Sequence, residues 1–248
     1  MIYPSKNLRY PVLDQSLSRG LVGYWPLDDQ GGIAYDRSGS GNHGTLVADT
    51  HSVISTRGRC LSFDGTGDYV GIPSKTYDLG TGTTFSFWAK RGITGIDMMA
   101  LGNSGSDVNK WIWLNAGNGL FLETDTNGDY FYGIIAVDTN WHHYVLSVKD
   151  YNGVVYEDGA DKTHSASSDV TNNITLDRIG SAKTLYFFNG LLSNVSIHNR
   201  ALSAQEVQQL YRYGIHKHRD LIELWTAASP ASGTIIPRIQ YYNQQMRA

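Results

Sequence analysis

The decisive stretch is Asp36-Arg37-Ser38-Gly39-Ser40-Gly41-Asn42-His43-Gly44, which lies between two strand-like segments, Leu21–Trp25 and Leu61–Gly65. Its glycines reach positive φ angles without a Cβ clash, and its Asp, Ser and Asn side chains can hydrogen-bond to nearby backbone groups. Such a density of turn residues is typical of a chain that reverses direction between neighbouring strands. The stretch therefore predicts an all-β fold.

The composition supports strands over helices. The 248 residues include 27 glycines and 16 tyrosines but four glutamates, which favours short strands and turns. The net charge is −3, with both signs mixed along the chain, so nucleic acid is not an expected partner. Membrane insertion is not expected, because no basic amphipathic segment or long apolar run is present. The single cysteine, Cys60, excludes an internal disulfide and is expected to be buried.

Short β-rich runs separated by turn residues extend from residue 20 to residue 200, at the spacing of a β-sandwich. The expected strands are Thr84–Lys90, Lys110–Leu114, Leu120–Glu123, Trp141–Val148, Gly153–Glu157, Leu176–Ile179, Leu185–Phe188 and Leu191–Ile197. A hairpin turn is expected at Asn127-Gly128-Asp129, because Asn-Gly suits type I′ geometry. No strong internal repeat is present, which disfavours a propeller or a solenoid.

One helix is predicted near the end of this region. Ser203 is placed to cap its N-terminus, and Glu206 completes a capping box three residues later. Leu202 can pack on Val207 as a hydrophobic staple, and Gly214 provides the stop signal.

The two ends of the chain differ from the middle. Residues 1–19 contain two prolines and are predicted to form an extended arm. Residues 215–248 hold apolar side chains, but too few to form a core of their own. We therefore predict one domain, residues 20–214, between an N-terminal arm and a C-terminal docking arm.

Several motifs occur in a fixed order within this domain. They are Gly23–Asp28, Asp36–Gly44, Leu61–Gly65, Asp68–Val70, Trp141–His143, Tyr156–Gly159, Gly190–Leu192 and Ala201–Tyr211. Together they resemble the laminin-G-like members of the concanavalin A-like lectin/glucanase jelly-roll family. The resemblance implies a jelly-roll sandwich of two antiparallel sheets with one short C-terminal helix.

A second resemblance concerns the setting of the protein. The segment Ser16–Val22 is similar to laminin-G-like proteins carried by bacteriophages. The first ten residues lack the apolar region of a secretory signal. We therefore expect a protein on a virion surface or otherwise outside the cell. Its expected partners are other virion subunits, bound through the arms, and cell-surface glycans, and it is expected to be oligomeric.

The family resemblance also implies a structural calcium ion, because many members hold one with this loop and a late strand. Calcium takes roughly six to eight oxygen ligands, and Asp36, Asn42 and loop carbonyls could supply several. The acidic pair usual in the family after the glycine equivalent to Gly190 is replaced here by Ser193 and Asn194. Asn194 is then the remaining candidate from that strand. The alternative is that Asp36 and Asn42 bond the amides of their own loop.

Four aromatic residues are candidates for glycan binding, which needs aromatic surface for sugar C–H groups and polar partners for hydroxyls. Trp111 and Trp113 share one face of a strand because side chains alternate. Tyr130 and Tyr132 are expected to do the same nearby, and Asn109 lies in the adjoining loop. The alternative is that these aromatic side chains fill the core or a subunit interface.

No catalytic motif is present in the sequence. Glycosidases need two closely placed carboxylates, and Glu157 and Asp158, adjacent at a turn, are expected to diverge. His142 and His143 are consecutive strand residues that point to opposite faces, so they cannot chelate one metal ion.

These observations favour a non-catalytic structural or recognition protein, a phage virion decoration or accessory protein that could also bind glycans. The alternatives are a free carbohydrate-binding lectin module, and a glycosidase or polysaccharide lyase with an unrecognised site.

Overall fold

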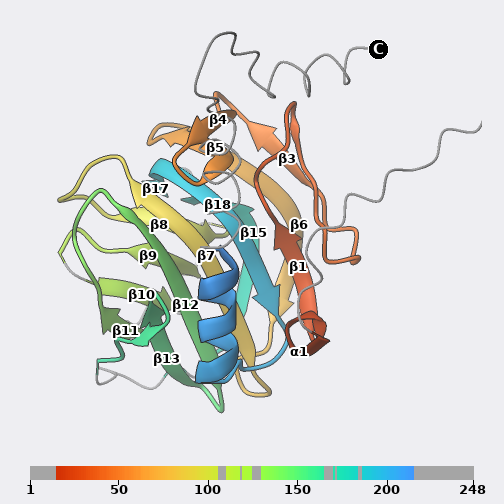
Figure 1. Ribbon diagram of the computed structural model, residues 1–248, viewed down its shortest axis with the longest axis vertical. Helices are drawn as coiled ribbons and strands as arrows, with labels where there is room; N and C mark the ends of the chain where they lie inside the picture. Colours follow the sequence, from red (N-terminus) through yellow and green to blue (C-terminus); the bar gives the residue numbers. More distant parts are fainter. Residues whose placement is uncertain are drawn as a thin grey trace, which may run out of the picture.

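The computed structural model describes residues 15–105, 110–117, 119–124, 130–164, 170, 172–183 and 186–214. Within these residues the chain forms two antiparallel sheets packed face to face, as the sequence predicts (Figure 1). We call the layer in front in Figure 1 sheet A and the layer behind it sheet B.

Sheet A is built around three long central strands. Its strands are β1 (Leu21–Trp25), β4 (His51–Ser55), β5 (Gly58–Asp64), β7 (Thr83–Arg91), β12 (Trp141–Lys149), β13 (Asn152–Glu157), β14 (Ala160–Asp161) and β18 (Asn189–His198). Their order is β14-β13-β12-β7-β18-β5-β4, with β1 paired to β18.

Sheet B has an equal number of strands. They are β2 (Ile33–Ala34), β3 (Gly44–Val47), β6 (Tyr69–Tyr77), β8 (Met98–Gly102), β9 (Trp111–Leu114), β10 (Gly119–Glu123), β11 (Tyr130–Ile134) and β15 (Ile174–Ile179). Their order is β11-β10-β9-β8-β15-β6-β3-β2. A separate short ribbon joins β16 (Ser181–Ala182) to β17 (Tyr186–Phe187). The hairpin turn predicted at residues 127–129 lies outside the described residues.

The core lies between the two sheets. Strand alternation directs Phe85 and Phe87 of β7 inward from sheet A, and Ile112 and Leu120 inward from sheet B. All four belong to one continuous cluster of buried side chains. Cys60 is also buried, as predicted.

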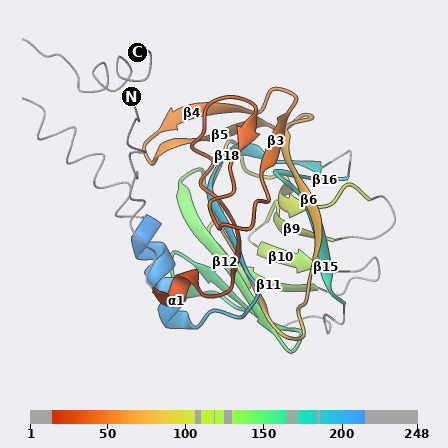
Figure 2. The same cartoon turned by 90° about the vertical axis from the view of Figure 1, so that its right-hand side faces the viewer.

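The predicted helix is present as residues 204–214 and lies across the outer face of sheet A (Figure 2). Its capping box is confirmed: the Glu206 carboxylate accepts the Ser203 amide at 2.9 Å, and Ser203 Oγ accepts the Glu206 amide at 3.4 Å. Leu202 and Val207 lie in the same buried cluster, as the staple predicts. The aromatic ring of Tyr211 stacks on Trp88 of β7 with 5.6 Å between ring centroids.

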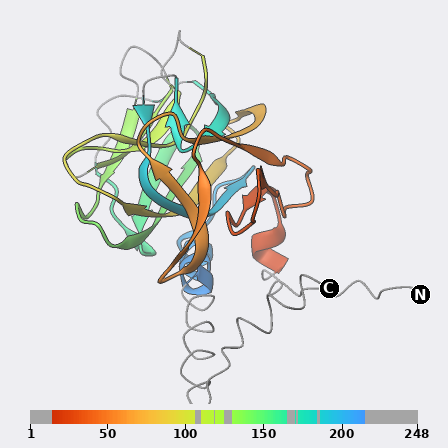
Figure 3. The same cartoon turned by 90° about the horizontal axis from the view of Figure 1, so that it is seen from above.

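The N-terminal boundary differs from the prediction. Gln15–Ser18 forms a short helix, α1, rather than part of an extended arm. Leu17 is 2% exposed and packs in the cluster under helix 204–214, on the same side of the sandwich (Figure 3). Four residues are too few to show a helical period in a sequence. Residues 1–14 and 215–248, where the arms are predicted, lie outside the described residues.

Neither helix among the described residues has the length and apolar character needed to cross a bilayer.

Candidate functional site

The outer face of sheet B carries the tryptophans that the sequence singles out. Along β9, Ile112 and Leu114 belong to the core, so Trp111 and Trp113 point away from it, as strand alternation predicts. Trp113 and Trp111 also pack with Met99 in a small cluster separate from the main core. This face therefore presents aromatic side chains that the core does not use.

The neighbouring strands extend this set. Phe121 of β10 lies directly opposite Trp113 of β9 on one side and Tyr132 of β11 on the other. Glu123 lies opposite Tyr130 in the next row. Because antiparallel partners have side chains on the same face, the register gathers all of them on the outer face of sheet B. Asn109, the predicted polar partner, lies outside the described residues.

The rings form a continuous row across the strands. Trp113 and Phe121 stack at 4.7 Å between ring centroids, Phe121 and Tyr132 at 4.7 Å, and Tyr132 and His164 at 4.9 Å. At the other end Trp113 meets Trp111 edge to face at 6.3 Å, and Trp111 meets Tyr186 at 5.5 Å. We call this row the aromatic ladder: Tyr186, Trp111, Trp113, Phe121, Tyr132 and His164.

Trp111 supports the ladder rather than presenting a free surface. It is 7% exposed, and its indole nitrogen donates a 2.8 Å hydrogen bond to the Glu123 carboxylate. The ammonium group of Lys183 lies 4.9 Å from the centre of its ring, in a cation–π contact. Tyr186, by contrast, is 42% exposed. Of the predicted sugar-contacting residues, the structure thus brings Trp113, Tyr130 and Tyr132 to an accessible surface.

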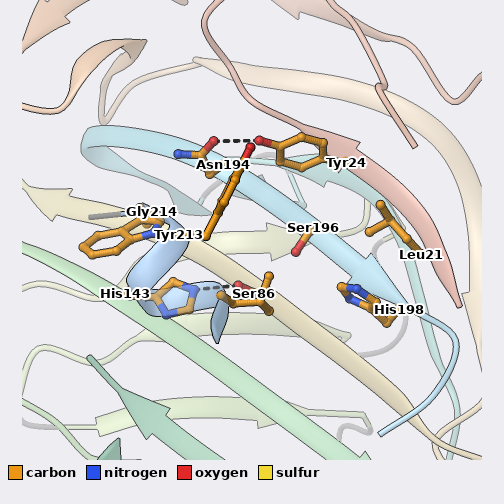
Figure 4. A pocket seen from close by; sticks show the side chains of 11 residues that line it. Leu21, Tyr24, Ser86, His143, Asn194, Ser196, His198, Tyr213 and Gly214 are labelled. Atoms are coloured by element: carbon orange, nitrogen blue, oxygen red, sulfur yellow. Dashed lines mark hydrogen bonds between the residues drawn. The ribbon is translucent and has the colours of Figure 1, made fainter. Parts of the chain in front are cut away.

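A small pocket lies on the other side of the molecule, between helix 204–214 and sheet A (Figure 4). Tyr213 points from the helix toward Asn194, and His143 and His198 form part of the opposite wall. The pocket has a volume of about 30 Å³, enough for about two water molecules at roughly 10–15 Å³ each. It cannot admit a sugar.

The same pocket contains a serine–histidine pair. Ser86 Oγ lies 2.8 Å from His143 Nε2, within the reach of a nucleophile and its base. Burial and the nearby Arg57 charge lower the pKa of His143 to about 3, so it is a weak base near neutral pH. Its Nδ1 atom has no partner among the described residues, so no carboxylate orients the ring. This pair lacks the features of a catalytic dyad.

A larger open hollow of about 450 Å³ lies beside the start of helix 204–214. It is lined by Ser16, Arg19, Thr81, Lys149, Arg200, Ala201 and Glu206. The Arg200 guanidinium is committed to Glu206, at 2.7 Å, and to the backbone carbonyls of residues 16 and 19. None of the described residues that line the hollow is aromatic, so they do not offer the surface that sugar C–H groups contact.

The side chains of the two adjacent histidines of β12 point to opposite faces of the strand, as predicted. His143 is buried under the helix, whereas His142 Nδ1 lies 2.7 Å from Asp158 and 3.9 Å from Glu157. The hydrogen bond that His142 donates to the Asp158 carboxylate is the main cause that raises the pKa of His142 to about 9.

Glu157 and Asp158 therefore converge on His142, and the prediction that they diverge is wrong. Asp158 has a φ of 53°, and this left-handed turn breaks the strand alternation that would have separated the two carboxylates. Gly159, the next residue, marks such a turn in the sequence.

Comparison with known families identifies the fold. The profile of the concanavalin A-like lectin/glucanase superfamily, laminin G type, matches residues 64–208, more than half of the chain. The chain belongs to this superfamily. No curated protein sequence matches it.

Several solved structures share the superfamily fold. Domain 4 of an extracellular arabinanase from Geobacillus stearothermophilus, in complex with arabinotriose, is 17% identical with a TM-score of 0.61, over 77% of this chain and 98% of that chain. The receptor-binding domain of a botulinum neurotoxin C/D mosaic serotype is 13% identical with a TM-score of 0.60, over 78% of this chain and 51% of that chain. Trypanosoma rangeli sialidase is 18% identical with a TM-score of 0.58, over 77% of this chain and 32% of that chain.

The loop in which the superfamily resemblance implies calcium is held by its own hydrogen bonds. Asp36 Oδ1 accepts the amides of Tyr24 and Ser38 at 2.9 and 2.8 Å, and Oδ2 accepts the amide of Asn42 at 2.9 Å. The Asn42 backbone carbonyl accepts the indole N–H of Trp25 at 2.8 Å. Both carboxylate oxygens of Asp36 and the Asn42 carbonyl, three of the predicted calcium ligands, therefore already accept hydrogen bonds from the protein.

Asn194 is occupied in the same way. Its side-chain oxygen accepts the Tyr24 hydroxyl at 3.0 Å, and its amide nitrogen donates to Ser193 at 3.0 Å. Among the described residues, no group of three or more His, Cys, Asp or Glu side chains is arranged to hold a metal ion. Asp36 is the single carboxylate in the predicted set, which fits calcium poorly.

Proposed function

We propose that this chain is a non-catalytic carbohydrate-binding module that acts outside the cell, with its ligand face on the outer side of sheet B. The observation that carries the proposal is the aromatic ladder, which gathers rings from three adjacent strands and two flanking segments on one face. Helix 204–214 covers the outer face of sheet A instead (Figure 2).

The chemistry of this face suits a sugar. Half-exposed aromatic side chains supply apolar contact for C–H groups, and polar groups among them can pair with hydroxyls. The polar groups are the phenol hydroxyls of Tyr130, Tyr132 and Tyr186 and the imidazole of His164. All of them lie within or beside the ladder.

The arabinanase domain adds support from fold similarity. The structural match extends over almost the whole of the arabinanase domain, and that domain is in complex with arabinotriose. A domain of this size and shape can therefore act as a sugar-binding unit. We infer the same class of ligand here, without assigning the sugar.

Two pairs of side chains among the described residues resemble catalytic pairs, and the surroundings of each support the non-catalytic part of the proposal. The Ser86–His143 pair is buried under the helix, with each residue 2% exposed, beside a cavity of about 30 Å³. The converging carboxylates Glu157 and Asp158 are engaged by His142.

The narrower setting predicted from the sequence, a phage virion with arms docked on neighbouring subunits, stays a prediction. The docking arms that it depends on fall in residues 1–14 and 215–248, which lie outside the described residues. Deleting residues 217–248 should abolish incorporation into particles while the sandwich stays folded. Particles that still incorporate the shortened chain would contradict the docking role.

A glycan array tests the proposed function. We expect saturable binding by the wild-type protein, and weaker binding by Trp113→Ala. Tyr35→Ala is the matched control, because Tyr35 is 41% exposed but follows β2, at the opposite edge of sheet B from β11. Binding should persist in EDTA, since the ladder contains no calcium ligand. No binding to any carbohydrate on the array would contradict the proposal.

A further inference from the structure

The ladder rings stand upright on the sheet rather than lying flat. The three stacked pairs, from Trp113 to His164, have centroid separations of 4.7–4.9 Å and angles of 9–21° between ring planes. Those separations equal the spacing of hydrogen-bonded strands, about 4.7–4.9 Å. Trp113, Phe121 and Tyr132 therefore each rise from a separate strand, and His164 continues the stack beyond β11.

This stacking limits what a ligand can touch. The faces of Phe121 and Tyr132 are turned toward their neighbours in the row, so the solvent side of the row consists of ring edges. A sugar that lies on an aromatic platform needs an open ring face. Along this part of the ladder, a single sugar unit would instead contact the edges of one or two rings.

The two cavities found among the described residues lie away from this face. One lies under helix 204–214 and the other lies beside the start of that helix. Neither is lined by a residue of the ladder. Small-molecule sites normally enclose most of their ligand, so a lone monosaccharide would gain little here.

The ladder is long and its contacts repeat. It runs across β9, β10 and β11, with Tyr186 at one end and His164 at the other. Small contacts repeated along a row add up only for a ligand that spans several of them. Tyr130 lies beside Tyr132 with 6.1 Å between ring centroids, and the Lys183 ammonium lies 4.9 Å from the centre of the Trp111 ring, so polar groups accompany the row.

We propose that the ladder binds an internal segment of a linear polysaccharide, laid across the strands along the row of ring edges. This inference rests on the proposed function and names its ligand class, an extended chain of several sugar units rather than a chain end or a single sugar. The binding free energy becomes more favourable as more sugar units contact the ladder.

The test is a length series. We would titrate the protein by calorimetry with linear arabinan, xylan, mannan and β-glucan oligosaccharides, each from the monosaccharide to long oligomers. In the series that binds, we expect the association constant to rise by about tenfold or more from the disaccharide to the longest oligomer. A monosaccharide that binds as tightly as the long oligomers would overturn the inference while leaving carbohydrate binding intact.

Variants at one end of the ladder sharpen the test. Tyr186→Ala removes an exposed end ring and should lower the affinity for long oligomers more than for short ones. Tyr35→Ala, with nearly equal exposure, should change neither. An equal loss at every length would overturn the extended binding mode, and no binding of any oligomer or array glycan would overturn the proposed function itself.

Discussion

The indole nitrogen of Trp111 donates a 2.8 Å hydrogen bond to the carboxylate of Glu123, its direct cross-strand neighbour on β10. Both side chains are almost fully buried on the outer face of sheet B. The pair therefore fixes β9 against β10 and sets the register on which the stacking of Trp113 and Phe121 depends. A residue expected to contact sugar instead positions the residues that we propose as the sugar contacts.

Trp111→Phe should destabilise the domain by about 1–3 kcal/mol, because it removes a buried hydrogen bond to a charged group while keeping an aromatic ring. Urea denaturation followed by circular dichroism measures the change. Trp113→Phe, at the neighbouring half-exposed position, is the control and should cost less. A Trp111→Phe protein as stable as the control would show that the hydrogen bond does not hold the two strands.

Arg57 anchors helix 204–214 to sheet A. Its guanidinium lies 3.2 Å from the centre of the Trp88 ring and donates to the Gly214 carbonyl at 3.0 Å. Burial lowers the pKa of Arg57 to about 10, so the group stays charged at neutral pH. Arg57→Met keeps much of the volume but loses both contacts, and should cost roughly 1–3 kcal/mol.

Arg59→Met is the matched control for Arg57. Arg59 lies two residues later, at the start of β5, and donates a longer 3.2 Å bond to Ser52. Its loss should change the free energy of unfolding by about 0.5 kcal/mol or less. Equal effects in the two variants, measured by urea denaturation, would argue against a special anchoring role for Arg57.

His142 should make the fold lose stability at alkaline pH. The Asp158 hydrogen bond raises its folded pKa to about 9, above the unfolded value. The stabilisation is therefore complete below about pH 6.5 and is lost as the pH rises through 9. Because the site is partly exposed, we expect roughly 1–2 kcal/mol after screening. His142→Gln should flatten the stability curve between these pH values; a variant curve parallel to wild type would exclude this linkage.

His143 and His198 should instead make the fold lose stability at acidic pH. Burial is the main cause that lowers their folded pKa values to about 3 and about 4. Stability is then complete above about pH 6.5 and falls as the unfolded chain takes up protons, by about 2 kcal/mol per histidine at pH 5. Most carboxylates titrate below this range. Thermal unfolding of His198→Gln should show a shallower decline from pH 6.5 to 5, and an unchanged decline would contradict the assignment.

The Asp36 loop should be stable without calcium. Although burial opposes it, hydrogen bonds from the Ser38 and Tyr24 amides lower the pKa of Asp36 below its ordinary value. Asp36→Ala leaves those amides without their acceptor and should cost about 1–3 kcal/mol. We expect the wild-type melting temperature to be the same in calcium and in EDTA. A rise with calcium concentration that disappears in Asp36→Ala would instead establish a bound ion.

The sequence predicts most of the fold because its signals are local. Ser203 and Glu206 lie three residues apart, and Trp111 and Trp113 lie two apart, so capping and strand alternation are readable from spacing alone. The aromatic ladder is different. Phe121 and Tyr186 join it through cross-strand register and through the neighbouring β16–β17 ribbon. Neither relation has a signature in one sequence.

Two further differences have specific physical causes. The burial of Trp111 depends on Glu123, which lies twelve positions later in the sequence. That the two residues are partners is evident only from the register of β9 and β10. The convergence of Glu157 and Asp158 depends on one left-handed residue, and the Asp158-Gly159 dipeptide was the available signal. Long-range pairing decides the first difference, and a local left-handed turn decides the second.

The most direct test of the central claim is to map where the sugar binds. We would record amide and indole N–H chemical shifts of the labelled protein while adding the oligosaccharide that binds most tightly on the array. The account predicts that the shifts change along β9, β10 and β11, including the indole N–H of Trp113. Changes confined to the hollow beside the start of helix 204–214, or to the face of sheet A, would contradict the assignment of the binding face to sheet B.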